Sequence, residues 1–454
     1  MECQSVTEIL DIVTEEAAIM TGANASLALM RLVNLSKSQL QQLRSRPECT
    51  KFLSVLEQHI HELGPKYNPG KALLDGIAAA ASARLHEFQP QGISMLTWGY
   101  GKLDHAPAGD LLDQIAHALE LDVSVYRHQA VANMFYSFAR LQKDSPTLCA
   151  AVETHVTDHA EDFSPQELMN ILWAFVKFRF VPKQFIAALL EYVLDEDRAR
   201  TFRSSDWAAL IWGLASLGVS VPAEPMAAIN KAGLQHLPSM TAPELCNVMW
   251  GLSILDECNQ PIFVESMSQL LENKQQTVLE PRLLRQLLQA SALAQAADVS
   301  VSLPEPVHKA AAKWWRATAN TVPSLTHDGV SRTLKNLGVK HRVLVFLQEG
   351  LPTVDIALEA WGDQPKVAIQ VVGPHEVSTN TNTLLGRATA EARLLSASGW
   401  RPFHVVVSTF SDPASQQTRK IVSQLQKQGL QPGQLFRNRR TYSDGRTESA
   451  SGYK

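Results

Sequence analysis

Apolar residues recur at intervals of three and four through the middle of the chain. One such run is Leu168, Ile171, Leu172, Phe175 and Phe178. This is the spacing of a single buried face on a helix. A short break containing proline follows, and residues 185–194 then carry a second amphipathic pattern. The pattern therefore predicts two helices joined by a tight turn.

The same pattern returns about every 38 residues. Its large central residues, the anchors, are separated by 38, 37, 39, 38 and 38 positions, and the residue after each of the first five anchors is small. The anchors are Trp98, Tyr136, Trp173, Trp212, Trp250 and Leu288, and the small residues are Gly99, Ser137, Ala174, Gly213 and Gly251. Such regular spacing indicates a repeat protein.

A helical hairpin of this length cannot bury its own apolar face, so successive hairpins must stack and share one core. We therefore predict a mainly α fold in which residues 88–320 form an α-solenoid and residues 1–87 form a degenerate helical cap. The small residues let neighbouring helices approach closely. With small neighbours in register, the anchors are expected to lie in the core rather than to stack on bases.

The period ends after residue 293, and residues 304–317 predict a closing helix. Strands then alternate with helices, which indicates a small α/β domain over residues 324–430. The predicted strands cover residues 342–347, 354–358, 367–372 and 403–407, and the predicted helices cover 326–337, 389–396 and 416–428. Residues 431–454 are basic, and we predict that they are disordered.

Composition excludes several classes of protein. The 454 residues are 45% hydrophobic and 19% charged, which is typical of an ordered, soluble chain. No apolar run reaches the roughly 18 residues of a membrane span. The five cysteines lack CxxC spacing, which argues against a zinc or disulfide framework. The acidic N-terminus resembles neither a signal peptide nor a transit peptide, which predicts a nuclear or cytosolic protein or a trimmed or incomplete chain.

Charge divides at residue 323. Residues 323–454 hold 16 Lys and Arg against 10 Asp and Glu, whereas the remainder holds 25 against 35. A basic C-terminal domain next to an acidic solenoid suggests that the C-terminal domain contributes much of the attraction to a polyanion.

Both halves resemble known families. The 38-residue unit, with PQEL-x-N-x-LWA at residues 165–174, resembles the octotricopeptide repeat and, more distantly, the FAST-kinase-like helical repeats. The C-terminal part resembles a RAP domain. The resemblance rests on four motifs in this order: VDIAL (354–358), AI-x-V-x-GP (368–374), LG (385–386) and RLL-x-x-x-GW (393–400).

This resemblance implies an RNA-binding protein of organelle gene expression, acting on mRNA or rRNA in mitochondria or chloroplasts without a cofactor. Its partners would be single-stranded organellar RNA and, as further candidates, ribosomal or RNA-processing proteins. The RAP domain is related in fold to PD-(D/E)xK nucleases. Asp355 occupies the position of the first acid of such a nuclease, but Gln370 replaces the second, and neutral Gln offsets little Mg²⁺ charge.

Three columns of polar residues are candidates for reading RNA, because one-base-per-repeat proteins present two or three side chains from each unit. Amides can pair with base edges and cations can follow phosphates. The columns are Gln91, Gln129 and Gln166; Asn133, Asn170 and Asn247; and Lys102, Arg140 and Lys177, with His375 and Arg393 as candidates in the C-terminal domain. The basic column lapses at Ser216, Ile254 and Ala292, so any charged track should cover only the first repeats.

Each column also has a purely structural interpretation. The Gln residues can cap helices, the Asn residues can fix a neighbouring helix, and the cations can form a solvated face. Two other functions stay open. One is a protein-interaction or ribosome-associated scaffold, which the acidic solenoid favours. The other is a metal-dependent RNA endonuclease that uses Asp355, with Glu359 and Glu376 as possible replacements for the missing acid. His375 and His404 fit structural or phosphate-contacting roles better than catalytic ones.

Overall fold

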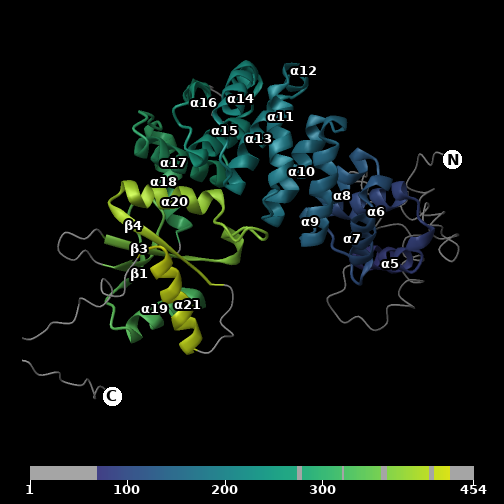
Figure 1. Cartoon of the computed structure of the whole chain (residues 1–454). Coiled ribbons are helices and arrows are strands. Elements are labelled where there is room, and N and C mark those ends of the chain that lie inside the picture. Colours follow the sequence, from purple (N-terminus) through teal and green to yellow (C-terminus); the bar gives the residue numbers. More distant parts are fainter. Residues whose placement is uncertain (1–68, 273–278, 320–321, 359–365, 408–413, 430–454) are drawn as a thin grey trace, which may run out of the picture. The chain divides into compact units, whose positions relative to one another are not determined.

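The computed structural model describes residues 69–272, 279–319, 322–358, 366–407 and 414–429. Within these ranges the chain is mainly helical, with one small four-stranded sheet near the C-terminus (Figure 1). This confirms the predicted fold class of a helical solenoid followed by a small α/β domain. Most of the predicted helical cap (residues 1–68), the residue Glu359 and the basic tail lie outside the described residues.

The helices follow one another as hairpins. After α5 (Pro69–Ala83), the first and second helices of each repeat alternate. The pairs are α6 (Pro90–Leu103) with α7 (Leu111–Leu121), α8 (His128–Arg140) with α9 (Pro146–Asp158), α10 (Pro165–Phe178) with α11 (Lys183–Leu194), α13 (Ser204–Leu217) with α14 (Ala223–His236), α15 (Ala242–Leu255) with α16 (Pro261–Glu272), and α17 (Pro281–Ala296) with α18 (Glu305–Ala317). A single-turn helix, α12 (Glu196–Ala199), follows α11. None of the described helices is long and apolar enough to cross a bilayer.

The start of α10 shows why these helices form where the sequence predicts them. The Ser164 main-chain N–H donates to Glu167 Oε2 at 2.7 Å, and the Glu167 N–H donates to Ser164 Oγ at 3.4 Å. This capping box satisfies main-chain donors that have no partner inside the helix. The helix ends at Arg179, which adopts a left-handed conformation with φ 54°.

The described contacts divide the chain into two compact units. The first comprises Met1–Gly213, Pro222–Ala232 and Thr379–Thr381, and the second comprises Leu214–Val221, Gly233–Ser378 and Asn382–Lys454. In the first unit, α6 packs on α8 and α8 on α10, and in the second α15 packs on α17. The domain limits expected from the sequence remain predictions.

The core of the first unit is aromatic and aliphatic. Phe135 and Phe175 are fully buried, and their ring centroids lie 4.8 Å apart in an edge-to-face arrangement between α8 and α10. Edge-to-face ring pairs of this kind are more favourable than their buried area alone would make them. The small residue after each anchor is buried where neighbouring helices meet. A Cβ added to Gly213 would lie 2.5 Å from Leu172 Cδ2, so this position has no room for a side chain.

The C-terminal sheet has the order β1-β2-β3-β4. It comprises β1 (Arg342–Val345), β2 (Val354–Leu358), β3 (Lys366–Val372) and β4 (Trp400–Val406), antiparallel except for the parallel pair β3 and β4. Helices α19 (Leu325–Asn336) and α21 (Ala414–Lys427) cover one face through buried Val330, Leu334, Ile421 and Leu425. Helix α20 (Gly386–Ala397) covers the other face (Figure 1). All four predicted strands are present; β2 has the predicted ends, and the ends of the other strands differ by at most three residues.

Three histidines lie together in the first unit. The ring centroid of His155 lies 5.9 Å from that of His128 and 4.9 Å from that of His159, and His128 packs edge-on against Phe163. Burial lowers the pKa of His155, and the nearby His159 and His128 lower it further, against the opposing effect of Asp158 and Asp122. The folded protein therefore favours the neutral form of His155.

Substitution of Gly213 tests the close approach of the helices. Gly213→Ala should lower the free energy of unfolding by about 1–3 kcal/mol, because the new Cβ collides with the buried Leu172 side chain. Leu172→Ala alone should cost about 2–5 kcal/mol through the cavity that it leaves. Urea unfolding of both single variants and the double variant should show that the double variant costs less than the sum. If the double variant cost as much as the two single variants together, the predicted collision between residue 213 and Leu172 would be contradicted.

The histidine cluster predicts a loss of stability in mild acid. The pKa of His155 is lower in the folded protein than its unfolded value of about 6.5. The resulting stabilisation is fully present when the pH is above the unfolded pKa, and it disappears as the pH falls through the lowered folded-state pKa. Urea unfolding at pH 7.5 and 5.5 should show a smaller difference for His155→Gln than for the wild type. His117→Gln, at an exposed position on α7, is the control and should retain the wild-type difference. Equal pH dependence in the His155→Gln variant and the wild type would refute this account.

Candidate nucleic-acid interface

One face of α6, α8 and α10 combines the predicted polar columns with the anchors. Counted from the anchor, the columns stand at −7, −3 and +4, and residues at i, i+4, i+7 and i+11 share one face of a helix. We call this the polar–aromatic face. It consists of Gln91, Met95, Trp98 and Lys102 on α6; Gln129, Asn133, Tyr136 and Arg140 on α8; and Gln166, Asn170, Trp173 and Lys177 on α10.

Solvent exposure sets this face apart from the core. All twelve of its residues are exposed or half-buried, whereas neighbouring residues such as Phe135 and Leu172 are buried. Each Gln is the second residue of its helix and is exposed, and Asn133 and Asn170 are half-buried at mid-helix. Each cation stands in the last turn of its helix. The structure thus brings eight of the predicted residues onto three adjacent helices.

The prediction that the anchors are core residues is wrong for these helices. Trp98, Tyr136 and Trp173 are half-buried. The ring centroids of Tyr136 and Trp173 lie 4.6 Å apart, and two cations of the basic column lie over anchor rings. Lys177 Nζ is 5.0 Å from the Trp173 ring centroid, and Lys102 Nζ is 5.6 Å from that of Trp98. A positive charge at this distance from an aromatic face is a cation–π contact.

Trp212 on α13 is also half-buried, but the anchors of the last two repeats agree with the core prediction. Trp250 is 8% exposed and Leu288 is 4% exposed. The indole Nε1–H of Trp250 donates to Gln289 Oε1 at 2.9 Å, and Asn247 Oδ1 accepts from Gln286 Nε2 at 3.3 Å. Within the second unit, therefore, the predicted RNA contact Asn247 is held by a neighbouring helix. These two repeats also lack a cation at the position of the basic column, where Ile254 and Ala292 stand.

Arg393 also has a structural task. From α20, its guanidinium donates to the carbonyl oxygens of Ser253 at 2.8 Å and Ile254 at 2.7 Å, and it forms an ion pair with Asp256. These carbonyls lie at the C-terminal end of α15, where main-chain acceptors lack partners inside the helix. The RAP-like Leu385-Gly386 pair serves the same packing, because a Cβ on Gly386 would lie 1.8 Å from the carbonyl oxygen of Ala215. The predicted RNA contact is therefore a packing residue of the second unit.

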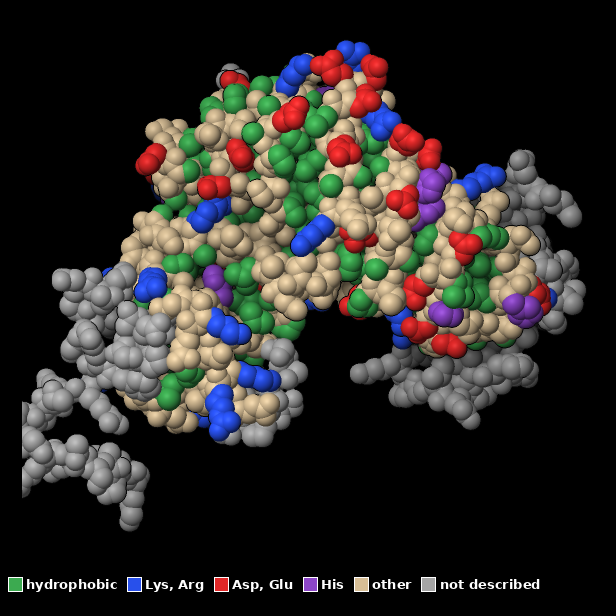
Figure 2. Space-filling model, in the orientation of Figure 1, with side chains coloured by type: hydrophobic (Ala, Val, Ile, Leu, Met, Phe, Trp, Pro, Cys, Tyr) green, Lys and Arg blue, Asp and Glu red, His purple; other side chains and the backbone are tan. Residues whose placement is uncertain are grey.

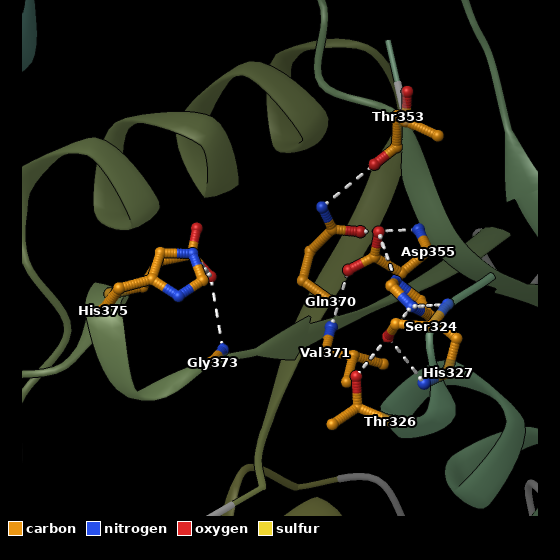
Figure 3. Close-up of polar contacts among 10 residues, drawn as sticks. Ser324, Thr326, His327, Thr353, Asp355, Gln370, Val371, Gly373 and His375 are labelled. Carbon is orange, nitrogen blue, oxygen red and sulfur yellow. Dashed lines mark hydrogen bonds and ion pairs between the residues drawn. The ribbon is translucent and has the colours of Figure 1, made fainter. Parts of the chain in front are cut away.

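The nuclease-like positions in the C-terminal sheet are engaged with the main chain (Figure 3). Gln370 Oε1 accepts from the Asp355 N–H and its Nε2 donates to the Thr353 carbonyl, both at 3.0 Å. Asp355 Oδ2 accepts from the Val371 N–H at 2.8 Å. The Gln370 amide thus occupies a donor and an acceptor of the β2 backbone, a pairing that a carboxylate could make only in part.

The other oxygen of Asp355 faces His327 without a hydrogen bond between them. The Ser324 N–H donates to His327 Nδ1 at 3.1 Å, which places the ring proton on Nε2, and Nε2 lies 3.3 Å from Asp355 Oδ1 (Figure 3). This is an ion-pair distance without the direction of a good hydrogen bond. Burial lowers the pKa of His404, with Asp355 acting in the opposite direction. In the described ranges, no three His, Cys, Asp or Glu residues are placed to hold a metal ion.

The remaining candidates in this domain lie outside that network. His375 is exposed and lies 3.9 Å from the Glu376 carboxylate. Glu376 Oε2 accepts from the Gly373 N–H at 3.3 Å, and burial raises the pKa of this carboxyl. Figure 2 shows several Lys and Arg side chains on the C-terminal domain and more acidic side chains over the helices of the solenoid. The structure leaves His375 accessible to a ligand.

Three features of this interface were not predicted. They are the exposure of the anchors, the participation of Met95, and two hydrogen bonds in the second unit. These two bonds run from Gln286 to Asn247 and from Trp250 to Gln289. The sequence carried a signal for the first. The core pattern of α10 stands at −5, −2, −1, +2 and +5 from the anchor, so a face at −7, −3, 0 and +4 points away from it.

The role of Gln370 can be measured by unfolding. Gln370→Leu should lower the free energy of unfolding by about 1–3 kcal/mol, because the Asp355 N–H and the Thr353 carbonyl lose their partner. Gln348→Leu makes the same chemical change at an exposed position and should have little effect. Equal urea midpoints for these two variants would show that the amide has no structural role.

No protein-family model matches the chain. Over 416 residues it is 24% identical to a chloroplastic RAP domain-containing protein of rice, Oryza sativa subsp. japonica, in an alignment that covers 88% of this chain. The chain spans about 60% of the length of that relative. The similarity supports a RAP domain in this chain, whereas the octotricopeptide or FAST-kinase-like type of the repeats remains a prediction.

Proposed function

We propose that this protein binds single-stranded RNA in an organelle and that the polar–aromatic face holds the RNA. One observation carries the proposal: amides, aromatic rings and cations recur at the same positions on α6, α8 and α10, and none of them is buried in the core. Proteins that bind single strands combine a positively charged track for the backbone with aromatic rings for the bases. The amides add acceptors and donors for base edges.

The rice relative supports the choice of compartment. That relative is named as a chloroplastic protein, and the RAP resemblance implies organellar RNA. We therefore propose the chloroplast, with mitochondria as the alternative, and mRNA or rRNA processing, stability or translation as the role. Imaging of a fluorescent fusion of the full chain tests the compartment.

A protein-interaction scaffold is the second candidate. The acidic excess outside residues 323–454 favours it, because a long RNA groove usually carries a positive surplus. The endonuclease alternative gains no support from the geometry, since the Gln370 amide is engaged with the β2 backbone. Salt dependence separates the first two candidates, because counterion release weakens RNA binding and leaves apolar contacts almost unchanged.

The basic column provides the test. Combined Lys102→Ala, Arg140→Ala and Lys177→Ala substitutions should reduce the slope of log affinity against log salt by about 2, since each phosphate contact to a single strand contributes about 0.7. Fluorescence anisotropy titrations with single-stranded RNA, repeated at salt concentrations from about 50 to 300 mM, measure this slope.

The matched control removes the same charge elsewhere. Lys183→Ala, Lys309→Ala and Lys313→Ala change exposed lysines on the second helices α11 and α18 and should leave the slope near the wild-type value. Equal losses in the two triple variants would show that only net charge matters. Absence of RNA binding by the wild type would leave the scaffold as the better explanation.

A further inference from the structure

A cavity of about 550 Å³ opens at the C-terminal ends of α8 and α10, within the first unit. The rings of Tyr136 and Trp173 line it, together with Arg140, Lys177, Arg179 and Asp144. Its volume lies within the roughly 300–1,000 Å³ of sites for small molecules and cofactors. The cavity therefore has the size of a site for one nucleotide at one end of the polar–aromatic face.

The aromatic wall suits a base. Both rings are half-buried, and their centroids are 4.6 Å apart, so they form a paired surface rather than two isolated side chains. Stacking on such a surface tolerates any base, because every base has a π face. The rings provide affinity for a flat ligand without choosing among bases.

The cations suit a phosphate. Three positive side chains and one carboxylate line the cavity, so it favours an anion. The Arg179 Nε is buried and has no hydrogen-bond acceptor among the described residues. Lys177 Nζ lies over the Trp173 ring and within reach of the same space. The positive charge of Arg179, which lines the cavity, would attract a phosphate in the same way as those of Arg140 and Lys177.

Two residues that line the cavity, Gln142 and Asp144, carry side chains that can distinguish bases. Asp144 is the acidic one, and an ionised carboxylate only accepts hydrogen bonds. The Watson–Crick edge of guanine presents adjacent ring and amino N–H donors, which match the two oxygens of a carboxylate. Adenine and cytosine offer an amino donor beside an acceptor, and the single donor of uracil stands between two carbonyls. The preferred base is therefore guanine.

We propose that this cavity is a guanosine-selective nucleotide subsite. The base stacks on Tyr136 and Trp173, Asp144 accepts from the guanine edge, and Arg140, Lys177 and Arg179 bind the adjoining phosphate. The inference rests on the proposed RNA-binding function and adds to it a preferred base and a place along the helices where that base binds.

The test uses the full-length protein and an oligouridine of about eight nucleotides, the order of length that single-strand binding folds cover. Its central residue is guanosine, adenosine, uridine or an abasic ribose. Anisotropy titrations should show the guanosine oligonucleotide binding at least about fivefold more tightly than the uridine and abasic forms. Equal affinities for all four oligonucleotides would overturn the subsite and leave RNA binding intact. No binding to any of them would overturn the RNA-binding function as well.

Two variants assign the effect to this cavity. Asp144→Asn changes an exposed side chain, should fold normally, and should abolish most of the guanosine preference while RNA binding continues. Combined Tyr136→Leu and Trp173→Leu should reduce the difference between guanosine and the abasic ribose. Asp298→Asn, at an exposed left-handed position in the second unit, is the matched control and should retain the preference. An unchanged preference in Asp144→Asn would refute the role of this carboxylate and with it the proposed guanosine subsite.

Discussion

The close approach of successive first helices is the constraint on which the repeat region depends. Buried residues at −5, −2, −1 and +2 from each anchor, with a buried or half-buried residue at +5, form the side of each helix that packs on its neighbours, and small residues let those sides meet. Gly213 shows how tight the fit is, since a single added carbon would collide with Leu172. Because 3.6 residues complete a turn, the anchor lies at the border of this buried side and not in its centre. Trp98, Tyr136, Trp173 and Trp212 keep part of their surface in water at this border, whereas Trp250 and Leu288 are buried.

The architecture can be predicted from the sequence because the signals that specify it are local. Apolar spacing, Ser164-Pro165 at a helix start and alternating strands and helices each depend on neighbours in the chain. The role of Arg393 could not be read in the same way, since its partners Ser253 and Ile254 lie about 140 residues earlier. The burial of the anchors was misjudged for another reason. The expectation of buried anchors rested on the small residues next to them, although the helical period already placed the anchors beside the polar columns.

The two ends of the repeat array use similar residues differently. On α8 and α10 the anchors are accessible and each is followed by a cation four residues later. On α15 the anchor Trp250 is closed off by the amide of Gln289, and Ile254 stands where the cation would be. The C-terminal sheet shows a comparable change, because Gln370 uses its amide to complete the β2 backbone where a nuclease would carry an acid. In both places an amide is engaged within the fold: Gln289 with the indole of an anchor, and Gln370 with main-chain groups at a nuclease-like position.

The spacing of the first helices also has a consequence for the shape of a bound strand. Packed helices stand about 8–10 Å apart, whereas successive bases in a stacked strand rise by about 3.4 Å. An RNA that followed α6, α8 and α10 with one nucleotide for each helix would have to give up the stacking between its own bases. Hairpins and duplexes could not lie on such a surface without opening. A protein of this kind would keep its target segment unfolded, and so available to ribosomes, nucleases or a complementary strand.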